Sequence, residues 1–132
     1  MRAFRVLLAD DNAAIQLLIR RLMEPEFVII GSVFDGQALV TATLLHSPEI
    51  LVVDIAMPGM NGIEALRKLA SARPQAVIML TTHADPGLVE QAHGAGALGY
   101  VLKGRAASDL LPAIHAALRG DRFVSASIGG DS

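Results

Sequence analysis

Residues 51–62 read LVVDIAMPGMNG, and this stretch indicates what kind of sheet the chain forms. With Ile50 before it, an unbroken apolar run leads up to Asp54, and Met57-Pro58-Gly59 then predicts a turn. A strand that is apolar at every position, and not only at alternate ones, is typical of a sheet that is covered on both faces. We therefore predict a buried strand over residues 50–53 that ends at a carboxylate.

The same pattern recurs on both sides of this stretch. Apolar runs predict further strands over Phe4–Ala9, Phe27–Val33, Ala76–Leu80 and Leu98–Leu102. Helical spacing of apolar residues, caps and proline breaks predict helices over Asn12–Glu24, Asp35–His46, Gly62–Ala72, Asp85–Ala92 and Ser108–Leu118. Strict alternation of strand and helix predicts an α/β domain in which helices cover both faces of a parallel sheet.

Helical spacing also predicts which side chains point inward. Leu18 falls on the apolar stripe of the first helix and Leu45 on that of the second. Pro112 should lie in the first turn of the last helix or bend it. The last helix has more apolar residues than one inward stripe needs, so some of them serve either the core or a homodimer: Leu110, Leu111, Ile114, Ala117 and Leu118.

The length of 132 residues is that of one domain with a substantial core. We assign residues 1–122 to this domain. Residues 123–132 are assigned to a C-terminal tail, or to the start of a linker to an output domain that is absent from this chain. Apolar residues make up 52% of the chain and charged residues 18%, which predicts a folded and not a disordered chain.

Charge and cysteine content exclude several classes of protein. The net charge is −2 and no basic stripe is present, which argues against direct binding of nucleic acid. There is no cysteine, which excludes a disulfide framework and a thiolate metal site. The first apolar run, residues 6–9, is too short for a signal peptide or a membrane span. We expect a cytoplasmic protein that does not contact a membrane.

Polar side chains follow four of the predicted strands where each strand ends. Asp10 and Asp11 follow the first strand, Asp54 the third, Thr81 the fourth and Lys103 the fifth. The carboxyl ends of parallel strands meet at one edge of the sheet, where ligands bind in such folds. Three close carboxylates repel one another, and Mg²⁺, which prefers oxygen ligands, would relieve that repulsion. An aspartate can also be a nucleophile toward phosphorus.

Each of these residues has a simpler explanation when it is taken alone. An aspartate after a strand is often only a helix cap. A lone lysine there is usually a solvated surface charge, and a lone threonine a turn residue. The occurrence of the whole set at four strand ends favours a phosphoryl-transfer site, in which charge neutralisation and positioning are the main requirements.

Four segments resemble the receiver domains of two-component response regulators: VLLADDN at 6–12, LVVDIAMPGMNG at 51–62, VIMLTTHAD at 77–85 and GAGALGYVLKG at 94–104. The resemblance covers about residues 5–125. It implies a flavodoxin-like (CheY-like) fold with a five-stranded parallel sheet of strand order 2-1-3-4-5 and five flanking helices. It also implies a signalling switch that a histidine kinase phosphorylates, and that is not an enzyme although it assists its own phosphotransfer and dephosphorylation.

The resemblance also implies a role for each residue of the acidic group. Asp54 matches the phosphoacceptor of the receiver family. Asp10 and Asp11 match the acidic pair that holds Mg²⁺ together with Asp54, and the backbone carbonyl of Ala56 matches the group that completes the metal site.

The remaining motif positions match the phosphate-binding and switch residues of the family. Thr81 and Lys103 match the hydroxyl and the ammonium group that bind the phosphoryl oxygens. Thr81 and Tyr100 match the switch pair, in which Thr81 moves toward the new phosphoryl group and Tyr100 then rotates inward.

Residues 81–104 and 108–125 are similar to the NarL/LuxR type of regulator. Members of that type usually carry a C-terminal helix-turn-helix that binds DNA. The similarity implies transcription regulation as the output, with DNA contacted only through a domain that is not present in this chain.

Other classes of protein fit the sequence less well. A pseudo-receiver that acts by protein interaction without phosphorylation is opposed by the complete set of Asp, Thr and Lys residues. A haloacid-dehalogenase-like phosphatase needs a second aspartate where this chain has Ala56. A visible absorbance spectrum of the purified protein would decide whether it is a flavin-binding flavodoxin-like protein. The letters G-x-G-x-x-G at residues 94–99 lead into a strand and not into a helix, so they do not predict a dinucleotide site.

Overall fold

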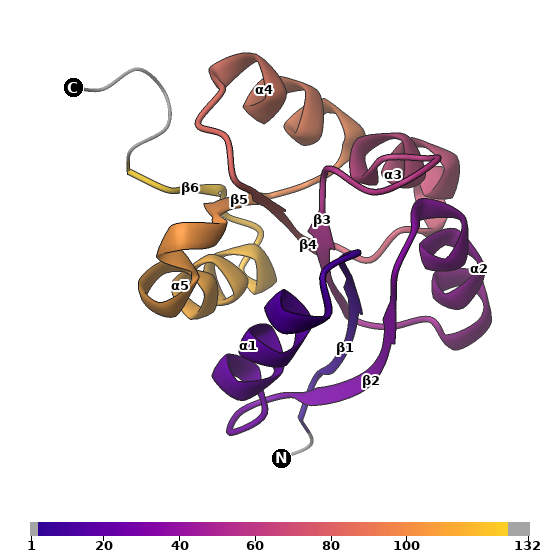
Figure 1. Ribbon diagram of the computed structural model, residues 1–132, viewed down its shortest axis with the longest axis horizontal. Coiled ribbons are helices and arrows are strands. Elements are labelled where there is room, and N and C mark those ends of the chain that lie inside the picture. The colour runs from indigo at the N-terminus through magenta and orange to yellow at the C-terminus, as the bar shows by residue number, and fades with distance from the viewer. Residues whose placement is uncertain (1–2, 127–132) are drawn as a thin grey trace.

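The sheet contains six parallel strands in the order β2-β1-β3-β4-β5-β6 in the computed structural model, which describes residues 3–126 (Figure 1). The strands are β1 (Arg5–Ala9), β2 (Val28–Val33), β3 (Ile50–Asp54), β4 (Ala76–Thr81), β5 (Gly99–Leu102) and β6 (Phe123–Val124). The predicted order 2-1-3-4-5 is confirmed, and a short sixth strand extends the sheet beyond β5.

Helices cover both faces of the sheet (Figure 1). They are α1 (Ala13–Met23), α2 (Gly36–His46), α3 (Gly62–Leu69), α4 (Pro86–Ala95) and α5 (Ala106–Leu118), with short 3₁₀ helices η1 (Ala70–Ala72) and η2 (Lys103–Arg105). The buried clusters show that α1 and α5 pack on one face, whereas α2, α3 and α4 pack on the other.

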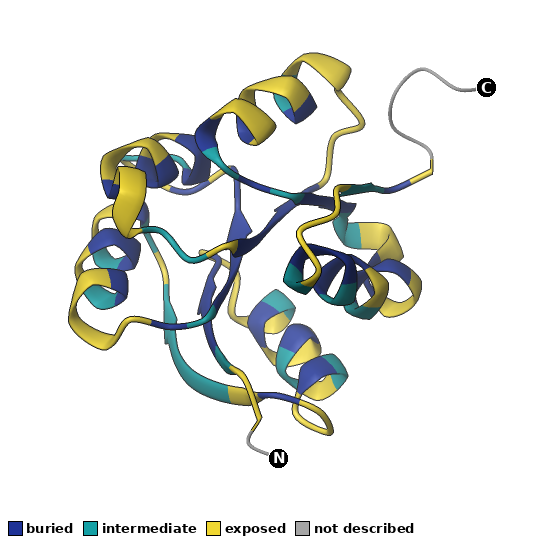
Figure 2. Ribbon diagram, turned by 180° about the vertical axis from the view of Figure 1, so that it is seen from behind, coloured by how far each residue is buried: buried dark blue, intermediate teal, exposed yellow. Residues whose placement is uncertain are grey.

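The central strands form the core, and the β2 side of the sheet is more open. Every residue of β3 and β4 is buried, whereas no residue of β2 is fully buried (Figure 2). Burying one large aliphatic side chain stabilises a fold by about 1.5–3 kcal/mol. The chain segments that end at the centre of the carboxyl edge are therefore the most firmly held.

Side-chain caps mark the start of four helices at this same edge. Asn12, Asp35 and Asp85 accept hydrogen bonds from amide groups in the first turns of α1, α2 and α4. Asn61 and Glu64 form a reciprocal capping box at the start of α3. Such caps satisfy amide groups that the first helical turn leaves without partners. They also define where each strand-to-helix connection begins.

Two apolar residues that helical spacing placed inward are exposed. Leu18 is 40% exposed because the buried stripe of α1 runs through Gln16, Ile19 and Met23. Leu45 is 73% exposed because the buried stripe of α2 ends at residue 43, and a residue two places further on lies about 200° around the helix. These two predictions were wrong.

The last helix forms core on the side that faces the sheet. Leu110, Ile114 and Ala117 are completely buried, and Leu111 and Leu118 are half-buried against the same cluster. The helix begins two residues earlier than predicted and continues through Pro112, which lies beyond its first turn. Of the two predicted alternatives, a place for Pro112 in the first turn was wrong, and a bend of the helix at Pro112 stays a prediction.

The C-terminal boundary also differs from the prediction. Phe123 and Val124, assigned to a tail, form β6 and pair with Gly99 and Tyr100 of β5. Ser125 follows them and is 1% exposed. The rest of the predicted tail, residues 127–132, lies outside the described residues. Within residues 3–126, no helix has the length and apolar character that crossing a membrane requires.

Candidate functional site

Three carboxylates meet at the carboxyl edge of the sheet. Asp54 is the last residue of β3, and Asp10 and Asp11 directly follow β1, the strand beside it. Each of the three offers a carboxylate oxygen, and these oxygens lie within 4.8 Å of one another. Asp10 and Asp54 are each 3% exposed, whereas Asp11 faces solvent. The structure thus brings these three carboxylates together, as the sequence predicted.

Lys103 joins the two buried carboxylates. Its Nζ lies 2.9 Å from Oδ2 of Asp10 and 3.1 Å from Oδ2 of Asp54. Burying a charge is costly unless it is paired, so the ammonium group offsets much of the penalty for enclosing the carboxylates. One positive charge among three carboxylates still leaves the cluster negative.

Backbone amides hold the other oxygen of each buried carboxylate. Oδ1 of Asp10 accepts a hydrogen bond from the Asn12 amide at 2.8 Å. Oδ1 of Asp54 accepts one from the Ala56 amide at 3.1 Å. Both carboxylates are thus oriented with one oxygen on the backbone and the other on Lys103.

The surroundings of Asp54 and Lys103 shift the pKa of both groups. Burial is the main cause that raises the pKa of Asp54, and repulsion from Asp10 is the second. Lys103 and the Ala56 amide act in the opposite direction. Burial would lower the pKa of Lys103, but its hydrogen bonds and charge interactions with Asp10 and Asp54 outweigh burial and raise that pKa. Lys103 is therefore held in its charged form.

The acidic cluster fits a divalent cation. Three carboxylate oxygens at this spacing form a hard donor set of the kind that Mg²⁺ and Ca²⁺ use. Repulsion from Asp10 contributes, after burial, to the raised pKa of Asp54, and a cation would offset that repulsion. Ala56 is exposed beside the cluster and its amide is occupied by Asp54. The role of its carbonyl as a further ligand remains a prediction.

Thr81 lies on β4, the strand beside β3, and Tyr100 lies on β5, the strand beyond β4. Thr81 ends β4, is 4% exposed, and accepts a hydrogen bond from the His83 amide at 3.1 Å through its hydroxyl oxygen. Tyr100 in β5 is buried within the cluster under α4. Burial raises the pKa of the Tyr100 hydroxyl, and an interaction with Thr81 opposes that rise. Tyr100 thus already occupies the inward position that was expected only after phosphorylation.

One residue that supports the acidic cluster of Asp10, Asp11 and Asp54 was not predicted from the sequence. Gln16 is buried in α1, and its Nε2 donates hydrogen bonds to the carbonyl oxygens of Asp10 and Val33, both at 2.8 Å. It therefore ties together the carboxyl ends of β1 and β2. The signal was present, because Gln16 is a polar residue on the same helical stripe as Ile19 and Met23.

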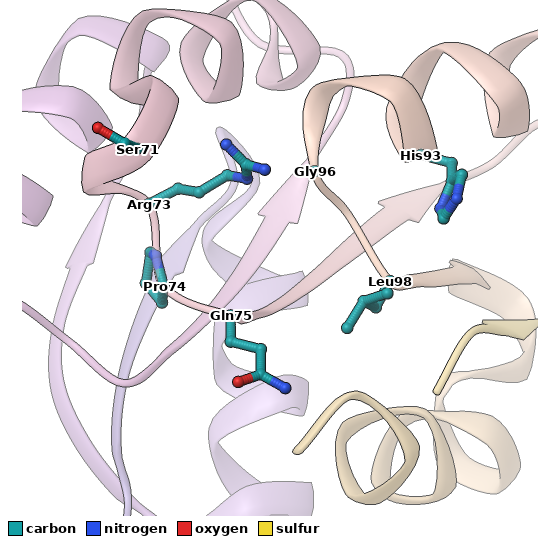
Figure 3. Close-up of a pocket in the computed structure, with 7 residues that line it drawn as sticks. All are labelled: Ser71, Arg73, Pro74, Gln75, His93, Gly96 and Leu98. Atoms are coloured by element: carbon teal, nitrogen blue, oxygen red, sulfur yellow. The ribbon is translucent and has the colours of Figure 1, made fainter. Parts of the chain in front are cut away.

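A cavity of about 460 Å³ lies at the opposite edge of the sheet, before the starts of β4 and β5 (Figure 3). The residues that line it are Ser71, Arg73, Pro74, Gln75, His93, Gly96 and Leu98. Arg73 donates to the carbonyl of Ala70, and the His93 ring contacts the carbonyl of Ala97. None of the described residues that line this cavity is acidic, so it lacks the charge pairing of the carboxyl edge.

The response regulator receiver domain family matches residues 6–115 of the chain. Among curated proteins, the transcriptional regulatory protein PdtaR of Mycobacterium tuberculosis H37Rv is 39% identical over 126 residues, which cover 95% of this chain and 62% of PdtaR. The response regulator UvrY of Escherichia coli K12 is 33% identical over 93% of this chain and 58% of UvrY. The chain thus spans less than two thirds of the length of these relatives.

Solved structures agree with this match. A two-component response regulator of the LuxR family from Aurantimonas sp. SI85-9A1 superposes with a TM-score of 0.89 at 30% identity, over 96% of this chain and 93% of that one. The isolated receiver domain of RcsB from Salmonella enterica serovar Typhimurium, solved in the presence of the phosphomimetic BeF₃⁻, gives a TM-score of 0.85 at 26% identity, over 96% of each chain.

Proposed function

Because this chain belongs to the response regulator receiver domain family, we propose that Asp54 is its phosphoacceptor and that a histidine kinase supplies the phosphoryl group. The observation that carries the proposal is the contact of Lys103 with both Asp10 and Asp54 at the carboxyl edge. A lysine held in this position neutralises charge where phosphoryl transfer would add it.

The transfer forms a bond between phosphorus and a carboxylate oxygen of Asp54 while the bond from phosphorus to the donor imidazole nitrogen breaks. The role of the protein is mainly to position the groups and to neutralise charge. Lys103 binds a phosphoryl oxygen in place of its contact with Asp54, and the Thr81 hydroxyl donates to another. The Ala56 amide keeps the Asp54 carboxyl group oriented, as its hydrogen bond to Oδ1 supports.

Mg²⁺ is the cation that we propose for the acidic cluster. Asp10, Asp11, Asp54 and the carbonyl oxygen of Ala56 would hold it, and when bound it shields the charge of the carboxylates and the phosphoryl oxygens. Mg²⁺ suits this role because it is a hard cation that prefers oxygen ligands and accepts waters and phosphate oxygens among them.

The switch that we propose acts on a tyrosine that is already buried. Phosphorylation adds a charge of about −1.5 to −2 and three acceptor oxygens. Thr81 is drawn to these oxygens, and the inward position of Tyr100 is then held more firmly relative to an outward one. The surface formed by α4 and β5 carries this change to a partner, because a local charge event biases an element that has two positions.

Intact mass spectrometry after incubation with acetyl phosphate and Mg²⁺ tests the phosphoacceptor. The parent protein should gain one phosphoryl group, and Asp54→Ala and a chelator-treated sample should gain none. An Asp11→Asn variant, which keeps the phosphoacceptor, should gain the group more slowly. A folded parent that gains no phosphoryl group would contradict the proposal and favour a phosphorylation-independent interaction module.

The output that we propose is regulation of transcription. The relatives named as transcriptional regulators, and structural neighbours of the LuxR family, support this proposal. We infer a cytoplasmic protein whose DNA-binding helix-turn-helix belongs to a region beyond this chain, with homodimerisation as a further step in output. Determining the sequence of the full-length protein tests the inference: a basic helix-turn-helix after residue 132 is the expected result, and a region of another class would overturn it.

A further inference from the structure

The segment Phe123–Ser125, called the C-terminal segment from here on, is fastened to β5 by backbone hydrogen bonds. The Phe123 amide donates to the Leu98 carbonyl at 2.9 Å, and the Ser125 amide donates to the Tyr100 carbonyl at 3.0 Å. Phe123 packs with the cluster under α1 and α5, and Val124 packs with the cluster on the other face. The segment therefore closes the edge of the sheet beside Tyr100.

The Ser125 side chain fastens the segment a second time. Its hydroxyl donates to Oδ2 of Asp109 at 2.7 Å and accepts the Leu102 amide at 3.1 Å. Ser125 is 1% exposed, so water does not compete for these bonds. A buried hydroxyl with both a donor and an acceptor partner is a specific attachment, because losing either partner leaves a buried polar group unsatisfied.

Asp109 connects this attachment to the turn that carries Lys103. Besides Ser125, the Asp109 carboxylate accepts hydrogen bonds from Nε of Arg105 at 2.9 Å and from the Ser108 hydroxyl at 3.0 Å. Leu102 precedes Lys103 and Arg105 follows it by two residues. Both sides of Lys103 are thus held by the same Ser125–Asp109 pair.

We propose that the Ser125–Asp109 pair is a latch that couples the position of Lys103 to the C-terminal segment, so that a phosphoryl group on Asp54 loosens this segment from β5. The inference rests on the proposed function, because it takes Lys103 as the group that binds the phosphoryl oxygens. In the present structure Lys103 contacts Asp54 directly. A phosphoryl group between the two displaces the ammonium group, and the displacement acts on the Leu102 amide and on Arg105.

Thermodynamic linkage makes the coupling reciprocal. If occupation of Asp54 weakens the latch, then a broken latch strengthens the binding of a phosphoryl mimic by the same factor. Phe123, Val124 and Ser125 are also the residues that lead toward the C-terminus. The latch would therefore pass the state of Asp54 directly to whatever follows this segment in the chain.

The first test is an equilibrium titration of the full chain with beryllofluoride at saturating Mg²⁺, followed by calorimetry. Ser125→Ala removes the hydroxyl, and its affinity for beryllofluoride should rise by about five-fold or more, which is the lower end of typical coupling between sites. The matched control is Arg122→Ala. Arg122 directly precedes the C-terminal segment, and the substitution breaks its exposed ion pair with Glu90. The affinity of this variant should stay within about two-fold of the parent.

The second test needs no variant, so it is decisive even if Ser125→Ala fails to fold. Amide hydrogen exchange is measured in the parent with and without beryllofluoride. Exchange at Leu102 and Ser125 should become faster with the mimic, whereas the Val28 amide, bonded to the Phe4 carbonyl at the far side of the sheet, should not change.

The outcomes separate this inference from the proposed function. If the parent binds beryllofluoride, and both the exchange at Leu102 and Ser125 and the affinity of Ser125→Ala are unchanged or shift in the opposite direction, the latch is overturned and the phosphoacceptor stands. If the folded parent does not bind beryllofluoride, the proposed function fails and the latch fails with it.

Discussion

The two edges of the sheet place ionisable side chains in opposite ways. At the carboxyl edge, Asp10, Asp54 and Lys103 are nearly buried and touch one another. At the amino edge, Arg73 and His93 border an open cavity, and each has a hydrogen bond with a nearby backbone carbonyl. The comparison teaches that the carboxyl edge, and not the cavity at the amino edge, is where this fold brings buried ionisable groups into contact. Charges that are forced together and desolvated gain strength from the low local dielectric, and those at an open cavity do not.

The largest expected difference between the edges is in the rate of phosphorylation. Lys103→Met removes the ammonium group that faces Asp54, and loss of one such charge-stabilising group typically lowers a rate by about 10²–10³-fold. Arg73→Met removes a cation of the amino edge and should leave the rate within about two-fold. Intact mass as a function of time with acetyl phosphate measures both variants. Equal losses in the two variants would show that the edges do not differ as described.

A second difference concerns stability and its dependence on pH. The pKa of Asp54 is raised in the folded state, so the unfolded chain releases this proton at lower pH than the folded chain does. From about pH 4 upward, the folded parent is therefore progressively destabilised until Asp54 is ionised in both states. Asp54→Asn removes this penalty and should raise the free energy of unfolding at pH 7.

The advantage of Asp54→Asn over the parent should disappear below about pH 4, where the carboxyl group is protonated in both states. It should also shrink when Mg²⁺ is added, because a cation stabilises the parent by mass action. Urea unfolding at several pH values, with and without Mg²⁺, measures both effects. Asp121→Asn is the control at an exposed carboxylate, and it should show no advantage at pH 7. A parent more stable than Asp54→Asn at pH 7 without metal would contradict this account of the acidic cluster.

The smallest expected effect on phosphorylation is at the amino edge, where a substitution should change stability and leave function intact. Gly96 ends α4 with φ of +115°, and a Cβ there would meet the Arg73 side chain. Gly96→Ala should therefore lower the free energy of unfolding by about 1–2 kcal/mol, because an L side chain is strained in this region. Phosphorylation should remain at the parental rate. The matched control is Gly94→Ala, where a Cβ meets open space and a helical position gains stability.

The same contrast explains which parts of the molecule were open to prediction from the sequence. Asp10, Asp54 and Lys103 were expected to meet because the carboxyl ends of parallel strands lie at one edge of the sheet regardless of the details of packing. The inward face of α1 was predicted less well. Gln16 was missed and Leu18 was placed inward, since spacing alone defines a stripe but not the direction in which that stripe faces.

The C-terminal boundary shows a second limit of prediction. The segment 123–125 is short and partly polar, and no local pattern distinguishes it from a tail. It packs because β5 offers an unpaired edge and Asp109 offers an acceptor, and both of these features come from distant parts of the sequence. The inward position of Tyr100 was also hidden from the local sequence, because it depends on the helix α4 packed over it.

Local sequence was enough to predict the alternation of strands and helices and the set of polar residues at the strand ends, because both follow from apolar runs and from the periodicity of helix and strand. The strand order came from the resemblance to receiver domains. Three other features became visible in the folded molecule alone: which oxygen of Asp54 faces Lys103, the support that Gln16 gives Asp10, and the burial of Ser125 against Asp109. Such contacts depend on the packing of elements far apart in the chain, and their hydrogen bonds gain strength only when that packing excludes water.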